Sequence, residues 1–351
     1  MTLPSLIAEL AAARHLSDNQ IRSAVEQIID ESVPASLKAD FLCHLALKGE
    51  TVEEIAAFAR ALREKAVQPP LDAAWRNTHQ ILDVCGTGGD RLNTFNISTT
   101  VAIICAAAGV PVAKHGNRAI TSQSGSADVL EALGIKIDLP PAEAARSLRE
   151  RNFAFFFAPN YHPAFRHIGP ARKLCADRGQ RTIFNFLGPL LNPAQPDMQL
   201  VGVPRPELCE PLAHVLQSLG ARRGMVVSGK VHRAADAVGF LDELSTLGEN
   251  TVAEFYQERG FASSVLDGAH FPLQTATLAD LAGGARETNA EIVRRILRGD
   301  ERGPKRDAVL LNAAAGLFVA NHTRTLSEGW DAAARLIDGG AAFKKLNELK
   351  S

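Results

Sequence analysis

Apolar side chains recur every three or four positions along the first 66 residues, which is the spacing of amphipathic helices. Four such stretches follow one another: SLIAELAAA, QIRSAVEQII, ASLKADFLCHLALKG and TVEEIAAFARALREKA. Ser17 with Gln20, and Thr51 with Glu54, have the spacing of capping boxes at helix starts. Residues 1–70 are therefore predicted to form a small all-helical domain, which ends at a Pro-Pro pair.

From residue 81 onward, short apolar runs alternate with helical patterns. The predicted strands are Ile81–Val84, Val110–Lys114, Ile135–Asp138, Phe153–Ala158, Gln199–Val203, Gly224–Ser228 and Thr251–Phe255. Pro141–Arg151 and Pro206–Leu219 are predicted helices. Because continuous apolar strands that alternate with helices are typical of a sheet covered on both faces, residues 71–351 are predicted to form a large α/β domain with a mostly parallel central sheet. The segment 159–193 interrupts this alternation with helical, polar sequence, and we expect it to pack toward the small domain.

Composition narrows the class of protein. The 351 residues are 46% hydrophobic and 22% charged, as in an ordinary globular protein. A formal net charge of -1 argues against general nucleic-acid binding, which requires a basic surface. The five cysteines are scattered without a CxxC pair, which favours reduced thiols over a disulfide framework or a zinc site. No apolar run is long enough to cross a membrane and the start lacks a basic, apolar leader, so we expect a cytoplasmic protein with no membrane partner.

Candidate chemistry gathers between residues 81 and 134, where each apolar run leads into a polar, glycine-rich loop that begins a helix. The first loop is Gly86-Thr87-Gly88-Gly89-Asp90, which lacks both the Walker pattern and the dinucleotide pattern. A tight turn explains it as well as close approach to a ligand does. Asn96-Ile97-Ser98-Thr99 follows, and a single hydroxyl there is most simply an N-cap. Together the two motifs are typical of an anion site at a helix start.

The second loop, Lys114-His115-Gly116-Asn117-Arg118, places two permanent cations at the end of a predicted buried strand. An unpaired cation there is costly, so we expect these side chains to face a cleft with an anionic occupant. A salt-bridged loop end is the alternative. Ser122, Ser124 and Ser126 supply hydroxyl donors at the next helix start, and Asp128 is interpreted as its cap.

Two further features carry chemistry. Arg172 lies in HPAFRHIGPARKLCADRGQRTIFNFLGPLLNP, and its guanidinium is suited to bind a carboxylate through two hydrogen bonds. Asp242 and Glu243 are adjacent in GFLDELS, where two carboxylates can hold a divalent cation. An acidic pair is common on protein surfaces, but together with a polyphosphate loop it is what magnesium-assisted departure of pyrophosphate requires.

The motifs GTGGD, TFNIST, KHGNR, SGSADVLEALG, HPA, RTIFNFLGPLLNP and LDELS occur in this order, and the series closely resembles the anthranilate phosphoribosyltransferase family over nearly the whole chain. The resemblance implies a small α domain hinged to a large α/β domain of the nucleoside phosphorylase/phosphoribosyltransferase type, in a homodimer that contacts through the small domains. It also implies a reaction of tryptophan biosynthesis. The 5-phosphoribosyl group of phosphoribosyl pyrophosphate (PRPP) is transferred to the amine of anthranilate, giving N-(5-phosphoribosyl)anthranilate and pyrophosphate.

The resemblance also assigns residues. The substrate-binding residues are Gly86, Gly89, Asp90, Thr94, Asn96, Ile97, Ser98, Thr99, Lys114, His115, Gly116, Asn117, Ser122, Ser126 and Arg172. Among them, Asn117 and Arg172 contact anthranilate. Ser98, Asp242 and Glu243 are the implied ligands of two Mg²⁺ ions. No side chain is assigned as a catalytic acid or base, because the neutral amine of anthranilate requires no strong base.

Some positions depart from the family pattern. Arg91 follows GTGGD where the family often has glycine, Thr121 replaces a frequent serine, and the stretch 230–238 is longer than the usual link to the acidic pair. Two alternatives remain open at this point. A pyrimidine nucleoside phosphorylase shares the implied architecture but binds phosphate and a nucleoside. A non-catalytic nucleic-acid-binding relative is expected to be basic and to lack the acidic pair.

Overall fold

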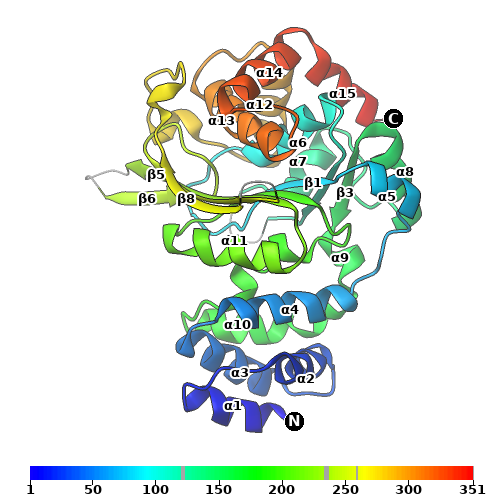
Figure 1. Cartoon of the computed structure of the whole chain (residues 1–351), viewed down its shortest axis with the longest axis vertical. Helices are drawn as coiled ribbons and strands as arrows, with labels where there is room; N and C mark the ends of the chain where they lie inside the picture. Colours follow the sequence, from blue (N-terminus) through cyan, green and yellow to red (C-terminus); the bar gives the residue numbers. More distant parts are fainter. Residues whose placement is uncertain (120–122, 233–236, 258–259, 351) are drawn as a thin grey trace.

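The computed structural model describes residues 1–119, 123–232, 237–257 and 260–350. A bundle of helices forms one end of the elongated molecule and an α/β body forms the other (Figure 1). The bundle begins with α1 (Leu3–Ala11), α2 (Asp18–Ile29), α3 (Ala35–Lys48) and α4 (Val52–Glu64), which confirms the four predicted helices. At the start of α4, Glu54 N donates to Thr51 Oγ1 (3.2 Å) and Thr51 N donates to Glu54 Oε2 (2.9 Å), so the predicted capping box is present.

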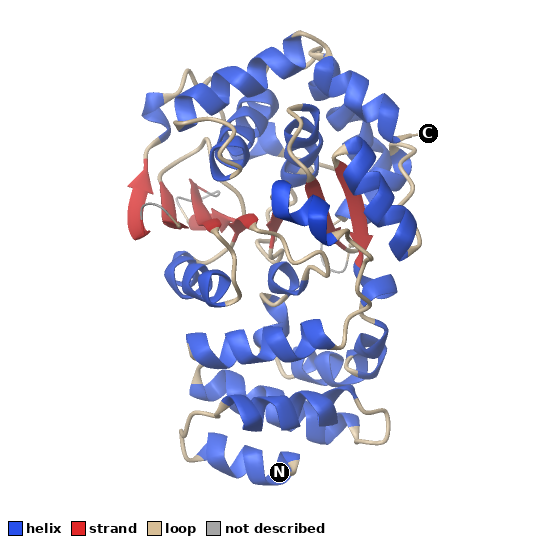
Figure 2. Cartoon of the chain, turned by 45° about the vertical axis from the view of Figure 1, so that its right-hand side comes forward, coloured by secondary structure: helices blue, strands red, loops and turns tan. Residues whose placement is uncertain are grey.

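An eight-stranded sheet forms the centre of the α/β body (Figure 2). Its strands are β1 (Leu82–Gly86), β2 (Val112–Gly116), β3 (Phe153–Phe157), β4 (Met198–Gly202), β5 (Arg223–His232), β6 (Val238–Leu241), β7 (Asn250–Tyr256) and β8 (Gly260–Leu266). The order is β3-β2-β1-β4-β5-β7-β8, with β6 also paired to β5. The pairs from β3 to β5 are parallel, and β6, β7 and β8 add antiparallel pairs. The predicted fold class, a helical bundle and a large α/β domain with a mostly parallel sheet, is confirmed.

Helices cover both faces of this sheet. The remaining α-helices are α5 (Ala73–Thr78), α6 (Ile97–Ala107), α7 (Ser126–Ala132), α8 (Pro141–Arg151), α9 (Ala158–Tyr161), α10 (Gly169–Asp177), α11 (Cys209–Ser218), α12 (Arg286–Arg298), α13 (Pro304–Val319), α14 (Leu326–Asp338) and α15 (Ala341–Leu349). Short 3₁₀ turns are η1 (Pro163–His167), η2 (Ile183–Asn185), η3 (Gly188–Leu191), η4 (Pro206–Leu208), η6 (Gly268–His270) and η7 (Leu278–Leu281). Leu200 on β4 joins the core beneath α6 and α13, whereas its neighbour Val201 joins the core shared with α11 and the bundle. Successive side chains of a strand point to opposite faces, so both faces are buried.

One predicted strand is wrong and two strands were missed. The segment Ile135–Asp138 forms no strand and instead connects α7 to α8. Its alternating pattern arises because Ile135 and Ile137 insert into the core, each 5% exposed, while the backbone N–H of Ile135 closes the end of α7 on Leu130 O (2.9 Å). β8 was missed because its side chains are mostly exposed, and an exposed edge strand carries no apolar run.

The segment that interrupts the strand–helix alternation lies against the bundle, where α10 packs on α3 (Figure 1). The buried Lys38 side chain of α3 donates from Nζ to Asp30 O (2.6 Å) and to His167 O (3.0 Å). Arg178 Nη1 forms an ion pair with Asp40 Oδ1 at 2.8 Å. None of the helices in the described parts of the chain is both long and apolar enough to cross a lipid bilayer.

Candidate active site

The carboxyl ends of β1 and β4 lie against the acidic turn that follows β6. Gly86 and Gly202 end these strands as direct neighbours in the parallel register. A Cβ atom on Gly86 would overlap Asp242 Oδ2, and one on Gly202 would overlap the backbone carbonyl of Asp242. Both glycines are therefore required for the acidic turn to approach the sheet. Gly202 was missed because no motif in the sequence surrounds it.

Two backbone N–H groups of the polar loops already bind carboxylates. Gly88 N donates to Asp242 Oδ2 (2.6 Å), and Ser98 N, in the first turn of α6, donates to Glu243 Oε1 (3.1 Å). Gly88 and Gly89 have φ angles of +77° and +86°, a conformation that glycine adopts without strain. The polar stretch between β1 and α6 thus binds two anionic groups, here the chain's own carboxylates, and Ser98 N does so at a helix start, as expected.

The cations of the second loop do not face an open cleft, contrary to the prediction. Lys114 is 1% exposed, and its Nζ donates to Val84 O (2.7 Å) and to Ser98 Oγ (3.3 Å). Arg118 instead pairs with Asp128 Oδ1 (2.9 Å) and Glu131 Oε2 (3.0 Å). The salt-bridged alternative therefore holds for Arg118, whereas Lys114 joins the end of β2 to the hydroxyl of Ser98.

Ionisation of the two carboxyl groups of the acidic pair is unfavourable in this structure. Burial raises the pKa of Asp242 well above its ordinary value, and the nearby carboxylates of Asp90 and Glu243 raise it further. Burial raises the pKa of Glu243 to about 7, although Lys114 and the hydrogen bonds from Ser98 oppose the shift. Neighbouring carboxylates that resist ionisation are stabilised by a cation between them.

The donor set fits magnesium that is bound together with a phosphate ligand. In the described chain, no three carboxylate, imidazole or thiol groups converge as a complete metal cage. Asp242, Glu243 and the Ser98 hydroxyl supply oxygen donors only. Mg²⁺ commonly uses one or two carboxylates and completes its coordination with water and substrate phosphate oxygens.

The loop after β2 is folded tightly on the start of α7. A Cβ atom on Gly116 would overlap Ser126 Oγ, which donates a hydrogen bond to Asn117 O (3.4 Å). Asp128 Oδ2 accepts from Gly125 N and from Ala119 N, each at 2.9 Å, so the predicted capping role of Asp128 is confirmed. Ser122 and Thr121 lie outside the described residues.

Asn96 is held by a residue from the far end of the chain. Asn289 on α12 donates from Nδ2 to Asn96 Oδ1 (2.9 Å), and Asn96 Nδ2 donates to Ser124 O (3.3 Å). Thr94 forms an isolated bridge with Ala282 nearby. Asn289 was missed because it lies in a helical stretch without a recognisable motif.

Ile97 and Thr99, two of the residues assigned by resemblance, are buried at the start of α6. Ile97 and Thr99 are each 1% exposed, and Ile97 belongs to the hydrophobic core. Their side chains position the helix.

A series of aromatic rings leads from His115 to Arg172. The ring centroids are 5.3 Å apart for His115 and His162, 5.0 Å for His162 and Phe165, and 5.8 Å for Phe165 and Phe184. The Arg172 guanidinium carbon lies 5.5 Å from the Phe184 ring centroid. Among described residues this guanidinium has no ion pair or side-chain hydrogen bond. His162, Phe165 and Phe184 were not proposed from the sequence, although HPAFRH and RTIFNF contain them.

The two histidines predict a loss of stability in acid. Burial lowers the pKa of His115 to about 3 and that of His162 to about 4, whereas an unfolded histidine has a pKa of about 6.5. Their contribution is therefore complete above about pH 6.5 and is lost as the pH falls toward 4. We expect the free energy of unfolding to fall by about 2 kcal/mol per histidine between pH 7 and pH 5. Denaturant titrations at each pH measure this, and a His115→Asn variant should show a shallower dependence; an unchanged slope contradicts the assignment.

The stretch before the acidic pair contributes two paired strands. β5 continues to His232 and pairs with β6 in antiparallel register, with Lys230 opposite Phe240 and His232 opposite Val238. Residues 233–236 lie outside the described part of the chain. After this pairing β6 returns the chain to Asp242.

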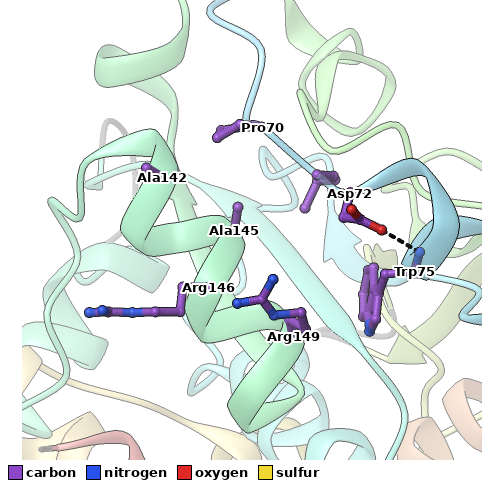
Figure 3. A pocket seen from close by; sticks show the side chains of 8 residues that line it. Pro70, Asp72, Trp75, Ala142, Ala145, Arg146 and Arg149 are labelled. Carbon is purple, nitrogen blue, oxygen red and sulfur yellow. Dashed lines mark hydrogen bonds between the residues drawn. The ribbon is translucent and has the colours of Figure 1, made fainter.

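A cavity of about 80 Å³ lies elsewhere, between the linker after α4 and the helix α8 (Figure 3). Trp75, Arg146 and Arg149 line it, and Asp72 Oδ1 accepts a hydrogen bond from Trp75 N (2.7 Å). It contains none of the residues assigned to the substrates or the metal, so it is not the candidate site.

Comparison with known proteins identifies the family. Residues 4–66 match the helical bundle domain of a glycosyl transferase family, and residues 78–343 match its a/b domain. The anthranilate phosphoribosyltransferase of Petrotoga mobilis is 45% identical over 98% of this chain and 94% of its own length.

Solved structures agree with this relationship. Anthranilate phosphoribosyltransferase from Thermus thermophilus superposes with a TM-score of 0.87, at 40% identity over 98% of each chain. The enzyme from Saccharomyces cerevisiae, solved in complex with PRPP and Mg, superposes with a TM-score of 0.84, at 26% identity over 99% of this chain and 96% of that one. The chain therefore belongs to the anthranilate phosphoribosyltransferase family.

Proposed function

We propose that the protein transfers the 5-phosphoribosyl group of PRPP to the amine of anthranilate, releasing pyrophosphate, as a step of tryptophan biosynthesis. The observation that carries this proposal is the meeting of two anion-binding backbone N–H groups, both in the polar stretch that joins β1 to α6, with an acidic pair. Gly88 N and Ser98 N lie within hydrogen-bonding distance of the Asp242 and Glu243 carboxylates. That is the arrangement needed to hold a polyphosphate together with its cation.

The two polar loops are proposed to form the PRPP site. Its residues are Gly86, Gly89, Asp90, Thr94, Asn96, the backbone of Ile97 and Thr99, Ser98, Lys114, His115, Gly116, Asn117, Ser122 and Ser126. Asp242, Glu243 and Ser98 are proposed to hold two Mg²⁺ ions, which neutralise negative charge on the departing pyrophosphate. The N–H groups of Gly88 and Ser98, which here donate to Asp242 and Glu243, are the donors that phosphate oxygens would use if the carboxylates held a cation.

The chemistry proposed is displacement at the anomeric carbon of the ribose. The amine of anthranilate is neutral and requires no strong base, so the protein contributes positioning and electrostatic stabilisation. Lys114 supports this by fixing the Ser98 hydroxyl through a 3.3 Å hydrogen bond. The histidine ring of His115 remains neutral, because burial lowers its pKa to about 3, and it does not act as an acid.

Anthranilate is proposed to bind along the aromatic series, with its carboxylate on Arg172 and with Asn117 nearby. Burial lowers the pKa of Arg172, which marks a guanidinium that has lost water without gaining an anion from the described chain. The Phe184 ring restrains the guanidinium and leaves its hydrogen-bond donors for a ligand.

The variant Arg172→Ala is expected to raise the KM for anthranilate about 10- to 100-fold, because a charge-assisted hydrogen bond contributes about 1.5–3 kcal/mol. The KM for PRPP should change little. Initial rates with each substrate varied in turn measure both constants. Lys173→Ala, at the next and exposed position of α10, is the control and should match the wild type. An effect on PRPP alone contradicts the assignment.

The direct test is a fluorescence assay of anthranilate consumption with PRPP and Mg²⁺, in which each component is omitted in turn. Loss of the signal on every omission supports the proposal. Phosphorolysis of thymidine or uridine by the protein would instead favour a nucleoside phosphorylase. Retention on a DNA column at moderate salt, without PRPP turnover, would favour a nucleic-acid-binding relative.

The proposal also includes the division into domains, the oligomeric state and the cellular location. The helical unit of residues 1–70 and the α/β unit of residues 71–351 act as two domains, with segment 159–193 packed toward the small one. The protein is a homodimer through the small domains and works in the cytoplasm. Light scattering of the purified protein tests the dimer directly.

A further inference from the structure

A single buried side chain holds the residue that follows the acidic pair. Leu244 N donates to Asn312 Oδ1 (2.9 Å), and Asn312 Nδ2 donates to Leu244 O (2.9 Å). The second amide hydrogen of Asn312 bonds to Ala308 O, one turn earlier on α13 (2.9 Å). Leu244 and Asn312 are both 0% exposed. Since Leu244 lies in a loop, Asn312 satisfies the two backbone groups that a neighbouring strand would otherwise pair.

The helix that carries Asn312 also supports the opposite side of the site. α13 packs directly on α6, whose first turn contains Ser98 (Figure 1). At Gly316, one turn after Asn312, an added Cβ atom would lie 3.0 Å from Cys105 Sγ and 3.4 Å from Val101 Cγ1. The two helices are therefore closely packed and leave little room for relative movement. Asn312 thus joins the acidic turn to the helix pair that positions Ser98.

A second asparagine makes a similar contact with a different consequence. Asn250, at the start of β7, accepts from Ser245 N (2.6 Å) and donates to Ser245 O (3.0 Å). This contact spans five residues and closes a local turn. The Asn312 contact spans 68 residues, so among these two it is the one that places the turn relative to α6.

We propose that Asn312 is a positioning residue that holds the Asp242–Glu243 pair at the correct distance from Ser98, acting through the backbone of Leu244. The inference rests on the proposed function, because it assigns a support to the metal-binding groups of that site. Asn312 contacts neither substrate nor metal. It fixes the position of the two carboxylates at which a cation and a phosphate bind. Substitution of supporting residues of this kind commonly lowers metal affinity about 10- to 100-fold.

The test uses two variants and a metal-binding measurement. Asn312→Leu removes all three hydrogen bonds at similar volume, and Asn312→Ala leaves room for water to bond to Leu244. Binding of Mn²⁺ in the presence of PRPP is followed by electron paramagnetic resonance, and Mg²⁺ is titrated in the activity assay. We expect Mn²⁺ affinity to fall about ten-fold or more and the half-saturating Mg²⁺ concentration to rise by a similar factor. The KM for anthranilate should stay within about two-fold of the wild-type value, because the Arg172 side of the site is not disturbed.

The control is Leu216→Ala on α11, a buried residue on the other face of the sheet. It should lower the melting temperature without changing the Mn²⁺ affinity. Wild-type Mn²⁺ affinity in the Asn312 variants, an equal loss in the control, or failure of both Asn312 variants to fold while the control folds would each overturn the positioning role. A wild-type protein that consumes no anthranilate contradicts the proposed function instead, so the two failures are distinguishable.

Discussion

The double variant Asp242→Asn, Glu243→Gln is expected to lose turnover by about 10³-fold, while the fold is retained. The loss follows because amide oxygens are neutral and no longer hold the cation that offsets the charge of the departing pyrophosphate. The fold should be retained because the site disfavours ionised carboxyl groups, as the raised pKa values of both residues indicate. Neutral amides of the same size therefore remove a repulsion.

Turnover at saturating Mg²⁺ and PRPP measures the first effect, and the melting temperature measures the second. The control is Glu207→Gln, an exposed carboxylate at the start of the sequence that leads into α11, which should change neither value. Unchanged turnover of the double variant at saturating Mg²⁺ contradicts the role of the pair. A strongly lowered melting temperature contradicts the claim that the carboxylates repel one another.

The variant Gly202→Ala is expected to lower kcat/KM about 100-fold or more, although position 202 touches no substrate in the proposed site. The new methyl group would overlap the backbone carbonyl of Asp242, which no side-chain rotation can relieve. The acidic turn must therefore move away from the ends of β1 and β4, and a displacement of about 1 Å can cost about 100-fold in rate. We also expect a loss of about 1–3 kcal/mol in the free energy of unfolding, as for other overpacked sites.

Steady-state kinetics and denaturant titration measure these two effects. Gly169→Ala, at the start of α10, is the matched control because an added Cβ atom meets nothing within 4 Å there. It should behave as the wild type. A Gly202→Ala protein with full activity would show that the acidic turn does not depend on contact with β4.

Most of the architecture could be predicted because it rests on local patterns. The helical periodicity of the first 66 residues and the capping box of Thr51 reflect contacts within one helix, and the bundle they predicted is confirmed. The parallel strands are buried on both faces, so each is a continuous apolar run of neighbouring residues, and such a run can be recognised in the sequence. The segment Ile135–Asp138 was predicted wrongly, since a connecting loop that inserts alternate side chains into a core has the pattern of a strand.

The candidate site could be predicted only as separate loops. Each motif marks a local requirement, such as the glycine conformation at Gly88 or the cap at Asp128, which neighbouring residues impose. Neighbouring residues in the sequence do not determine whether the Lys114 ammonium faces a cleft or a hydroxyl group. In the structure it donates hydrogen bonds to Val84 O and Ser98 Oγ.

The chain's order of residues thus specified the helical bundle, the parallel strands and the polar loops at their ends, because each depends on side chains close together along the chain. Folding in three dimensions settled how those loops combine. Gly88 and Asp242 are 154 positions apart, and their contact depends on the neighbouring register of β1 and β4 and on the absence of side chains at their last residues. The contact between Asn312 and Leu244 also depends on the tertiary structure. A hydrogen bond between distant segments forms only after packing has brought them together, so no local sequence pattern predicts it.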